Sequence, residues 1–462
     1  MTMVHITSSS NSGVADGATP PRSALRRGAR GILAGVCGVA IACTGAVAVA
    51  PAASAQTGSV SDNGFTHPDF YAPPAELPGG DPGQLIRSEP MGLAFDGLPG
   101  FWQGDAQRVM YTSIGARGGE VPVTGTYIRS SKPAPGGERP LAVVAPGTQG
   151  AGDQCAPSRN FETGLNVATS PPSISPGYEA VAAWTLVDRG FDVLVTDYEG
   201  LGTPGQHTYV HSDAQAHAVL DGARGAIAAS DGRLNPESPV VVTGYSQGGG
   251  AAAAAAEAAP DYAPDLNLKG VNASAAPLDL RATLKQVDGN LIAGVIGYAI
   301  NSFVAADPSL QTVLDEELND AGKRLLADTA NQCIGDSILT YPLRNTSDFS
   351  KSGESLDQII ERRPELSELL DSQKLGEKAP QVPVRLQGNL NDDVIPYEPI
   401  KNGAASWCAG GTAVEFVTDG LPPIVPRSAI NHLAPYLTNA NAVNDYLVGR
   451  VLDQPAPQNC AV

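Results

Sequence analysis

Short apolar runs alternate with stretches of helical period through the middle of the chain. The apolar runs lie at residues 140–145, 191–197 and 239–242, and residues 269–275 continue the rhythm. Residues 179–189 and 213–229, which lie between them, repeat their apolar positions with the period of a helix. A short, continuously apolar run suits a parallel strand that is covered on both faces. The alternation therefore predicts an α/β fold with a doubly wound, mostly parallel sheet.

Strand patterns also flank this central region. Residues 106–113 and 122–129 alternate like two antiparallel strands, with a glycine-rich turn between them. The preceding stretch 57–92 is rich in Pro, Gly and Asp, and we expect an extended arm that Phe70 and Tyr71 pin to the surface. Late in the chain, two further strands are predicted at 383–387 and 412–417, followed by a helix from residue 431 to about residue 451.

The rhythm breaks between residues 278 and 378, where helical patterns follow one another and strand patterns are absent. Residues 291–304, 315–330 and 356–370 are expected to be helical, the last of them interrupted at Pro364. We interpret this stretch as a helical cap inserted into the sheet domain. Its first helix has more apolar residues than one stripe needs, namely Ile292, Val295, Ile296, Tyr298, Ile300 and Phe303. They form either the core of the cap or the wall of a ligand pocket.

Charge and the N-terminal segment indicate the compartment. The chain has 48 acidic and 29 basic residues and a net charge of −19, which argues against binding to nucleic acid or to anionic membranes. A basic region up to Arg30 is followed by an apolar stretch at 32–49 and by Ala53-Ser54-Ala55. This arrangement predicts a signal peptide over residues 1–55, cleaved near Ala55, and therefore export.

The cysteines agree with export. Cys37 and Cys43 fall within the predicted signal peptide, which leaves Cys155, Cys333, Cys408 and Cys460. An even number of cysteines suits an oxidising compartment, and four cysteines allow three pairings. We favour Cys155–Cys333 and Cys408–Cys460, the second of which would fasten the tail. Free buried thiols are the alternative.

The pentapeptide Gly244-Tyr245-Ser246-Gln247-Gly248 lies between a buried strand and an alanine-rich helix. Gly-x-Ser-x-Gly in this context is the nucleophile elbow of serine hydrolases. The glycines are needed because a Cβ two residues from the serine would strike the adjoining strand or helix. The alternative is a glycine-rich turn with an uninvolved serine.

A serine nucleophile needs a base, and the base needs an orienting carboxylate. On this kind of fold the three groups follow in the order serine, acid, histidine. His432 is the only histidine after Ser246, so we expect it to be the base. The acid is Asp392 or Asp393, and we favour Asp392; Asp393 would then be a loop acid or a helix cap.

Other polar candidates surround these three. The glycine-rich loop after residues 140–145 contains Thr148 and Gln149, which we expect to contribute to an oxyanion hole together with the backbone N–H of Gln247. An ordinary turn is the alternative for the loop. The histidines at positions 207, 211 and 217 raise the question of a metal site, but their spacing and flanking residues do not favour one.

These motifs together resemble the secretory lipases, the group related to fungal lipase A. The resemblance covers the chain from about residue 65 to the end. It rests on Pro146-Gly147-Thr148-Gln149-Gly150, Cys155-Ala156-Pro157-Ser158, Asp197-Tyr198-Glu199-Gly200-Leu201-Gly202, Gly244-Tyr245-Ser246-Gln247-Gly248-Gly249, Asp392-Asp393-Val394-Ile395-Pro396-Tyr397 and His432.

The resemblance implies an α/β-hydrolase fold with a helical cap, with Ser246 as nucleophile, Asp392 as acid and His432 as base. It also implies one disulfide from Cys155 to the cap and another near the C-terminus. The position of the family's oxyanion-loop aspartate is occupied by Gln149, so a backbone or amide donor would replace that side chain.

We therefore expect a secreted serine lipase or carboxylesterase that acts on acylglycerols or other acyl esters and needs no cofactor or metal. The expected organisation is a signal peptide at 1–55, a hydrolase core at 56–277 and 381–462, and a cap at 278–380. A monomer that contacts lipid interfaces through its cap is expected. The alternatives are a short-chain esterase or serine peptidase, and a non-catalytic binding protein of the same fold.

Overall fold

The structure of the protein is a computed structural model, which describes residues 68–98, 100–169 and 172–460. The predicted signal peptide and its cleavage site lie outside the described residues. Everything that follows concerns the described part of the chain.

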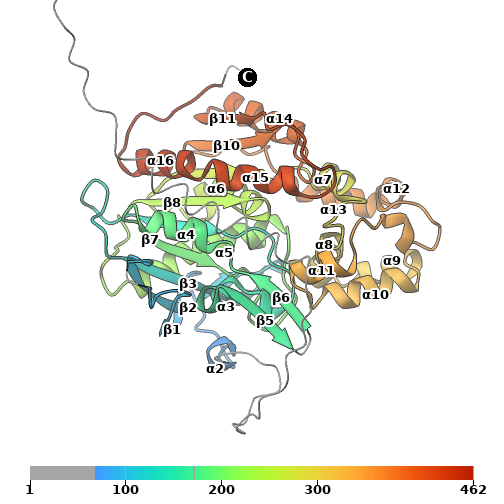
Figure 1. The fold of residues 1–462 in the computed structure, drawn as a ribbon, viewed down its shortest axis with the longest axis horizontal. Helices are drawn as coiled ribbons and strands as arrows, with labels where there is room; N and C mark the ends of the chain where they lie inside the picture. Colours follow the sequence, from blue (N-terminus) through green and yellow to red (C-terminus); the bar gives the residue numbers. More distant parts are fainter. Residues whose placement is uncertain (1–67, 99, 170–171, 461–462) are drawn as a thin grey trace, which may run out of the picture. The chain divides into compact units, whose positions relative to one another are not determined.

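A nine-stranded sheet forms the centre of the fold (Figure 1). Its strand order is β1-β2-β3-β7-β4-β8-β9-β10-β11. The pairs from β7 to β11 are parallel, and β1, β2 and β3 add an antiparallel extension at one edge. The strands are β1 Leu85–Met91, β2 Gly104–Ile114, β3 Glu120–Ser130, β4 Leu141–Ala145, β7 Asp192–Thr196, β8 Val240–Tyr245, β9 Leu268–Ser274, β10 Val384–Asn389 and β11 Val414–Asp419. The predicted mostly parallel, doubly wound sheet is confirmed.

Burial explains why the central strands are apolar at most positions. All residues of β4, β7 and β8 are buried. Val143 and Val242 belong to the hydrophobic core on one face of the sheet, whereas Val144 and Val241 belong to the core on the other. A strand with two covered faces gains from apolar side chains at both odd and even positions.

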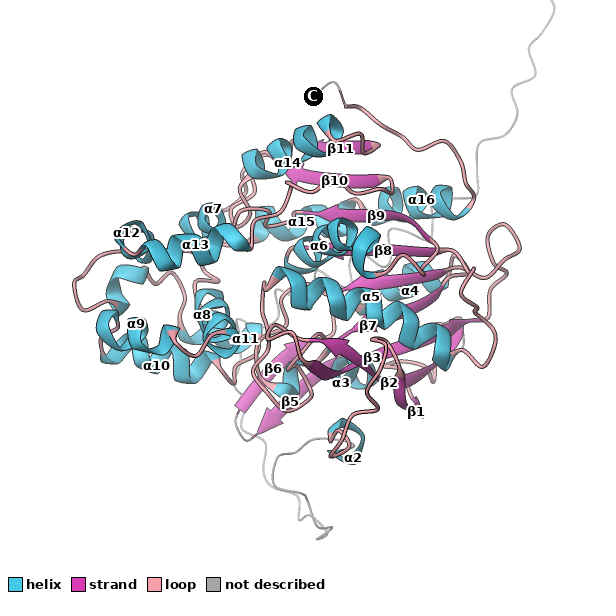
Figure 2. Ribbon diagram, turned by 180° about the vertical axis from the view of Figure 1, so that it is seen from behind, coloured by secondary structure: helices cyan, strands magenta, loops and turns pink. Residues whose placement is uncertain are grey.

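Helices cover both faces (Figure 2). One core includes residues of α5 Ser212–Ala229, α6 Gln247–Tyr262 and α14 Tyr397–Ala409. The other includes residues of α3 Pro157–Thr163, α4 Ala180–Val187 and α16 Ala440–Val451. Ala251–Ala256 and Ala259 of α6 are buried, and their small size lets the helix lie close to β8 and β9.

The segment expected to form a cap is helical. It contains α7 Leu280–Val287, α8 Val295–Ala306, α9 Leu310–Glu317, α10 Asp320–Thr329, α11 Ile334–Thr340, α12 Leu356–Arg362 and α13 Pro364–Ser372, with a 3₁₀ turn η3 at Thr346–Phe349. The break at Pro364 lies between α12 and α13, because proline starts a helix more readily than it continues one. The boundaries of the cap as a separate domain stay a prediction.

Three local expectations differ from the structure. The stretch before residue 92 is not only an arm: it contains α2 Pro68–Tyr71 and the edge strand β1, and it does bury Phe70 and Tyr71. A two-stranded hairpin, β5 Leu165–Thr169 and β6 Pro172–Pro176, was not anticipated. The last helix is divided into α15 Ile430–Thr438 and α16. No helix in the described residues has the length and apolarity required to cross a membrane.

Candidate active site

Ser246 occupies a strained turn between β8 and α6. Its φ of 59° and ψ of −122° are unusual for a residue with a side chain. A Cβ at Gly244 would lie 2.0 Å from the carbonyl oxygen of Gly248, and one at Gly248 would lie 2.0 Å from that of Ala145. Both glycines are therefore required by close backbone approach, which is the packing that the elbow interpretation predicts.

The structure brings Ser246, His432 and Asp392 together from three distant parts of the chain. His432 Nε2 lies 2.8 Å from Ser246 Oγ, and His432 Nδ1 lies 2.9 Å from Asp392 Oδ2. Ser246 follows β8, Asp392 follows β10, and His432 lies in the first turn of α15. The side chains of His432 and Asp392 are buried. This is the geometry of a nucleophile, a base and an orienting carboxylate.

The two neighbouring aspartates have different partners. Asp392 Oδ1 accepts hydrogen bonds from the backbone N–H groups of Val394 and Ile395 at 2.8 and 2.9 Å, which fixes the carboxylate toward His432. Asp393 turns the other way and accepts from backbone N–H groups at the start of α15, those of Ser428, Ala429 and His432. Of the two alternatives for Asp393, the structure therefore has the helix-capping one.

Tyr245 connects the turn at Ser246 to α15, the helix that contains His432. The sequence analysis did not identify this residue as part of the site. Its hydroxyl donates to the backbone carbonyl of His432. Burial raises the pKa of Tyr245 well above its usual value, so the hydroxyl keeps its proton for this hydrogen bond. The only sequence signal was its place beside Ser246 in the pentapeptide.

The glycine-rich loop after β4 lies beside Ser246. Thr148 lines the same cavity as Ser246 and Gln247, while the buried side chain of Gln149 donates to the carbonyl of Gly147. Gln247 is the first residue of α6, where backbone N–H groups have no acceptor within the helix. The loop and the first turn of α6 thus provide backbone N–H donors beside the cavity that Ser246 lines.

Two residues at the start of α4 hold this loop, and both were missed at the sequence level. Tyr178 donates to the carbonyl of Thr148 at 2.7 Å, and Glu179 accepts from the N–H of Gly147 at 2.6 Å. Tyr436 of α15 also donates to Glu179, at 3.3 Å. Complete burial raises the pKa of Glu179 to about 7, against the opposing effect of its hydrogen bonds.

A largely apolar cavity of about 170 Å³ lies between Ser246 and the cap helices. Residues of α8 and its preceding turn line it, namely Ile292, Val295, Ile296, Ile300 and Phe303. Tyr298 instead is fully buried, with its hydroxyl hydrogen-bonded to Ser337. Five of the six apolar residues named above for the first predicted cap helix therefore face a cavity that reaches Ser246.

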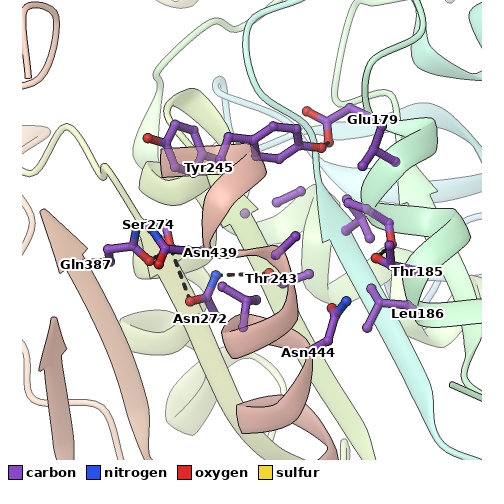
Figure 3. A pocket seen from close by; sticks show the side chains of 18 of the residues that line it. Glu179, Thr185, Leu186, Thr243, Tyr245, Asn272, Ser274, Gln387, Asn439 and Asn444 are labelled. Carbon is purple, nitrogen blue, oxygen red and sulfur yellow. Dashed lines mark hydrogen bonds between the residues drawn. The ribbon is translucent and has the colours of Figure 1, made fainter. Parts of the chain in front are cut away.

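A smaller cavity of about 50 Å³ lies behind Tyr245, between the sheet and the helices α4, α15 and α16 (Figure 3). Polar side chains line much of it, including those of Asn272, Ser274, Gln387 and Asn444. The amide nitrogen of Asn444 is buried and has no hydrogen-bond partner among the described residues. A cavity of this volume with polar side chains in its wall has room for ordered water that hydrogen-bonds to them.

The three histidines considered for a metal site have other contacts. His207 is buried, and its Nε2 lies 3.1 Å from the side-chain nitrogen of Gln247; burial lowers its pKa to about 4. His217 stacks on Tyr262, and His211 precedes α5 as its N-cap. Within the described residues, no group of three or more His, Cys, Asp or Glu side chains has an arrangement that could hold a metal ion.

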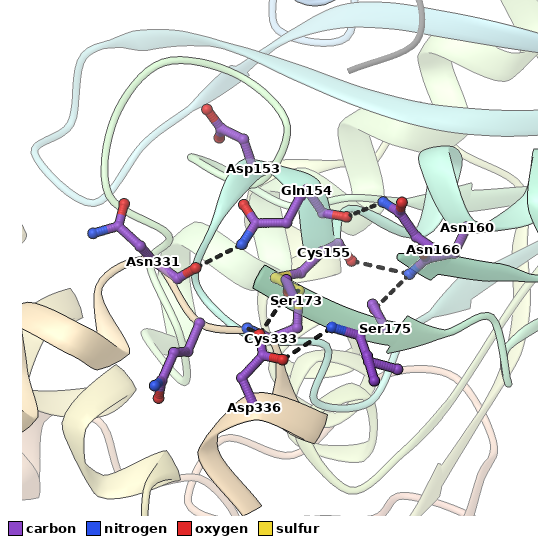
Figure 4. Close-up of a disulfide and its surroundings, with 12 residues drawn as sticks. Asp153, Gln154, Cys155, Asn160, Asn166, Ser173, Ser175, Asn331, Cys333 and Asp336 are labelled. Atoms are coloured by element: carbon purple, nitrogen blue, oxygen red, sulfur yellow. Dashed lines mark hydrogen bonds between the residues drawn. A yellow bond between two sulfur atoms is a disulfide. The ribbon is translucent and has the colours of Figure 1, made fainter. Parts of the chain in front are cut away.

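The disulfides have the favoured pairing. Cys155 in the 3₁₀ turn η2 Asp153–Cys155 bonds to Cys333, which precedes α11 (Figure 4). Cys408 of α14 bonds to Cys460 and so fastens the tail. The first bond links the sheet domain to the helical segment beside the loop that contains Thr148, since Gly150 and Cys333 also form a backbone bridge.

The sequence is similar to those of known lipases. The sequence model of the secretory lipase family matches residues 166–459. A probable inactive lipase of Mycobacterium tuberculosis is 30% identical over 76% of each chain. A secreted triacylglycerol lipase of Malassezia restricta is 25% identical over 75% of this chain and 72% of its own.

Solved structures show the same fold. Candida antarctica lipase A in its closed state superposes with a TM-score of 0.71 at 20% identity, covering 86% of this chain and 89% of its own. A rice cell wall degrading esterase of Xanthomonas oryzae superposes with a TM-score of 0.66 at 21% identity, covering 80% and 99%. The fold is that of the α/β-hydrolases, and the chain belongs to the secretory lipase family of ester hydrolases.

Proposed function

We propose that the protein is a lipase or carboxylesterase that works through the triad Ser246, His432 and Asp392 and an acyl-enzyme intermediate. The observation that carries the proposal is the continuous hydrogen-bonded chain from Ser246 Oγ through His432 to Asp392, at 2.8 and 2.9 Å, on a strained elbow beside an apolar cavity. Two side chains separated by 186 positions have no structural need to meet at this distance.

The reaction follows from these positions. His432 Nε2 takes the proton of Ser246 as Oγ attacks the ester carbonyl, and Asp392 stabilises the imidazolium and fixes its orientation. The backbone N–H groups of Gln247 and of Thr148 or Gln149 stabilise the negative charge on the carbonyl oxygen. His432 then protonates the leaving alcohol, and a water molecule activated by His432 hydrolyses the acyl-enzyme.

The apolar cavity favours an acyl ester as substrate. It extends from Ser246 along α8 and would hold the hydrocarbon chain of the acyl group, because burial of apolar surface is favourable. The related Malassezia proteins are named triacylglycerol lipases, which makes acylglycerols the first substrates to test. Contact with a lipid interface through the cap belongs to the same proposal.

The test is hydrolysis of p-nitrophenyl esters of increasing acyl length by the wild-type protein and Ser246→Ala. We expect activity that rises with chain length in the wild type and falls by about three or more orders of magnitude in the variant. Near-normal activity of Ser246→Ala would refute the assignment. Activity confined to the shortest esters would favour a short-chain esterase or peptidase.

A non-catalytic binding protein is the second candidate, because the relative from Mycobacterium tuberculosis is described as a probable inactive lipase. Covalent labelling of the purified protein by a fluorophosphonate separates the two. If Ser246 is activated, the wild type is labelled and Ser246→Ala is not. If the protein only binds ligand, neither the wild type nor Ser246→Ala is labelled.

The proposal includes export and a monomeric state. The related lipases are named secreted, and two disulfides suit an oxidising compartment. We expect cleavage near Ala55, which N-terminal sequencing of protein from the culture medium would test. Sedimentation equilibrium would test the monomer.

A further inference from the structure

The β5–β6 hairpin has its apolar side chains on the outside. Leu165, Val167 and Ile174 are 47%, 59% and 39% exposed. Val167 and Ile174 are directly opposite each other in the antiparallel ladder, and Leu165 lies two residues before Val167. Side chains two apart on a strand and directly opposite across a ladder share one face of the sheet. The three residues therefore form one outward apolar face, which we call the hairpin face.

The described inward side chains of the hairpin, Asn166, Ser173 and Ser175, are polar and hydrogen-bonded (Figure 4). Asn166 donates to the carbonyl of Gln154 at 2.7 Å, and Ser175 accepts from Asn160 at 2.8 Å. Asp336 of α11 accepts from the hydroxyl of Ser173 and from the N–H of Ile174. These hydrogen bonds, together with the adjacent disulfide, hold the hairpin against the cap helix.

This orientation is the reverse of the usual one. An antiparallel pair with one covered face ordinarily buries its apolar side chains and exposes its polar ones. A shift of one residue would turn every side chain of the hairpin over and bury the apolar set. Here the hydrogen bonds on the inward side specify the opposite register, so the apolar residues are held in contact with solvent. Three such residues on one face indicate an interaction surface.

The hairpin face lies beside the catalytic edge of the sheet. The chain runs directly from β6 to Tyr178 and Glu179, which hold the loop containing Thr148. On the cap side, a Cβ at Gly335 would contact the carbonyl of Ile174 at 2.8 Å. Leu339 lies one turn further along the same face of α11 and is 73% exposed. Leu339 thus adds an exposed apolar side chain on the cap side of the hairpin.

The distribution of charged residues in the chain indicates which binding partner suits the hairpin face. No Asp, Glu, Lys or Arg occurs from Gly164 to Tyr178, although the chain has a net charge of −19. A second copy of the chain or an anionic membrane would bring like charge to this surface, which costs free energy at long range. A neutral lipid surface brings no like charge, and exposed aliphatic side chains gain free energy when they are buried in it.

We propose that the hairpin face, extended by Leu339, docks the enzyme on a neutral lipid–water interface and so presents the catalytic edge to the lipid. This inference rests on the proposed function for the presence of lipid substrate. It differs from contact through the cap alone, because three of the four anchoring side chains belong to the sheet domain.

Binding is measured by cosedimentation with phosphatidylcholine vesicles containing triolein, in the Ser246→Ala background so that lipid is not consumed. Val167→Asp should lower the partition coefficient by about 10-fold or more, because it replaces an aliphatic contact by a charge. The double variant Val167→Thr/Ile174→Thr keeps β-branched side chains and strand propensity and should lower the partition coefficient by about 3-fold or more.

Leu452→Asp is the matched control. Leu452 is 37% exposed but follows α16 next to Asp453, which pairs with Lys269 at the start of β9, at the edge of the sheet opposite the active site. We expect this variant to bind vesicles like its parent. With Ser246 restored, all three variants should hydrolyse a dissolved short-chain ester as the wild type does, while Val167→Asp loses activity on emulsified triolein.

The outcomes are distinct. Unchanged vesicle binding by Val167→Asp, or an equal loss in Leu452→Asp, overturns the proposal. So does a wild-type dimer in sedimentation equilibrium that Val167→Asp dissociates, since a second copy would then cover the hairpin face. If the wild type hydrolyses no ester at all, the proposed function fails, and the vesicle measurement still decides whether the hairpin face binds lipid.

Discussion

Glu179 should make the stability of the protein fall as the pH rises from acid to neutral. Its carboxyl group is buried at the start of α4, where it accepts from the N–H of Gly147 at 2.6 Å and from the hydroxyl of Tyr436. Burial raises its pKa from 4.5 to about 7 in the folded state. The isosteric change Glu179→Gln keeps a carbonyl acceptor for Gly147 and removes the ionisation.

The magnitude and sign follow from proton linkage. Between pH 4.5 and about 7 the folded protein keeps the Glu179 proton and the unfolded chain releases it. The free energy of unfolding therefore falls with rising pH in this window. The stability is fully present below pH 4.5 and is lost by about pH 7. The difference between the two pKa values corresponds to about 3 kcal/mol, at about 1.4 kcal/mol per pH unit.

The assay is urea unfolding of wild type and Glu179→Gln at several pH values across this window. Other buried carboxyls, such as Asp197 with its pKa raised to about 6, contribute to both proteins and cancel in the difference. We expect the variant to match the wild type near pH 4.5 and to be more stable by about 3 kcal/mol above pH 7. If the unfolding free energies of the two proteins change with pH in the same way across this window, the reasoning is refuted. Glu179 would then have the same pKa in the folded and unfolded states.

Three further substitutions test the site and its supports. Asp392→Asn should lower kcat by about 10⁴-fold with little change in unfolding free energy, since the amide holds the wrong imidazole tautomer; activity within tenfold of wild type contradicts the role of Asp392. Asp393→Ala removes an acceptor from three backbone N–H groups at the start of α15. It should lower the free energy of unfolding by about 2 kcal/mol and lower kcat more than it raises KM; unchanged urea midpoints would contradict this role. Cys333→Ser opens a loop of 178 residues, for which chain entropy gives about 5 kcal/mol of lost stability in urea unfolding. A loss equal to that from opening the 52-residue loop by Cys460→Ser would contradict the entropic account.

Local pattern in the sequence predicted the sheet, the elbow and the chain order of the three residues proposed as the triad. β4, β7 and β8 are buried on both faces, so their composition alone indicated parallel strands. The glycines at 244 and 248 report a close approach of backbone that any side chain would block. His432 could be singled out because it is the only histidine after Ser246.

Only the tertiary structure shows the contacts that direct one carboxylate toward His432 and the residues that support the site. Asp392 and Asp393 are adjacent and chemically identical, and their backbone contacts alone direct one to His432 and the other to the start of α15. Tyr245, Tyr178 and Glu179 act on residues far away in the chain, a relation that no periodicity encodes.

The β5–β6 hairpin shows most clearly that sequence pattern does not reveal contacts made by the fold. Its alternating pattern is short. The polar side chains of Asn166, Ser173 and Ser175 face inward, while Leu165, Val167 and Ile174 face solvent. Sequence patterns are interpreted on the premise that apolar residues face the core, and this premise holds where the hydrophobic effect decides the orientation. In the hairpin, hydrogen bonds to Asp336, Gln154 and Asn160 decide it instead, and those partners are brought there by the fold.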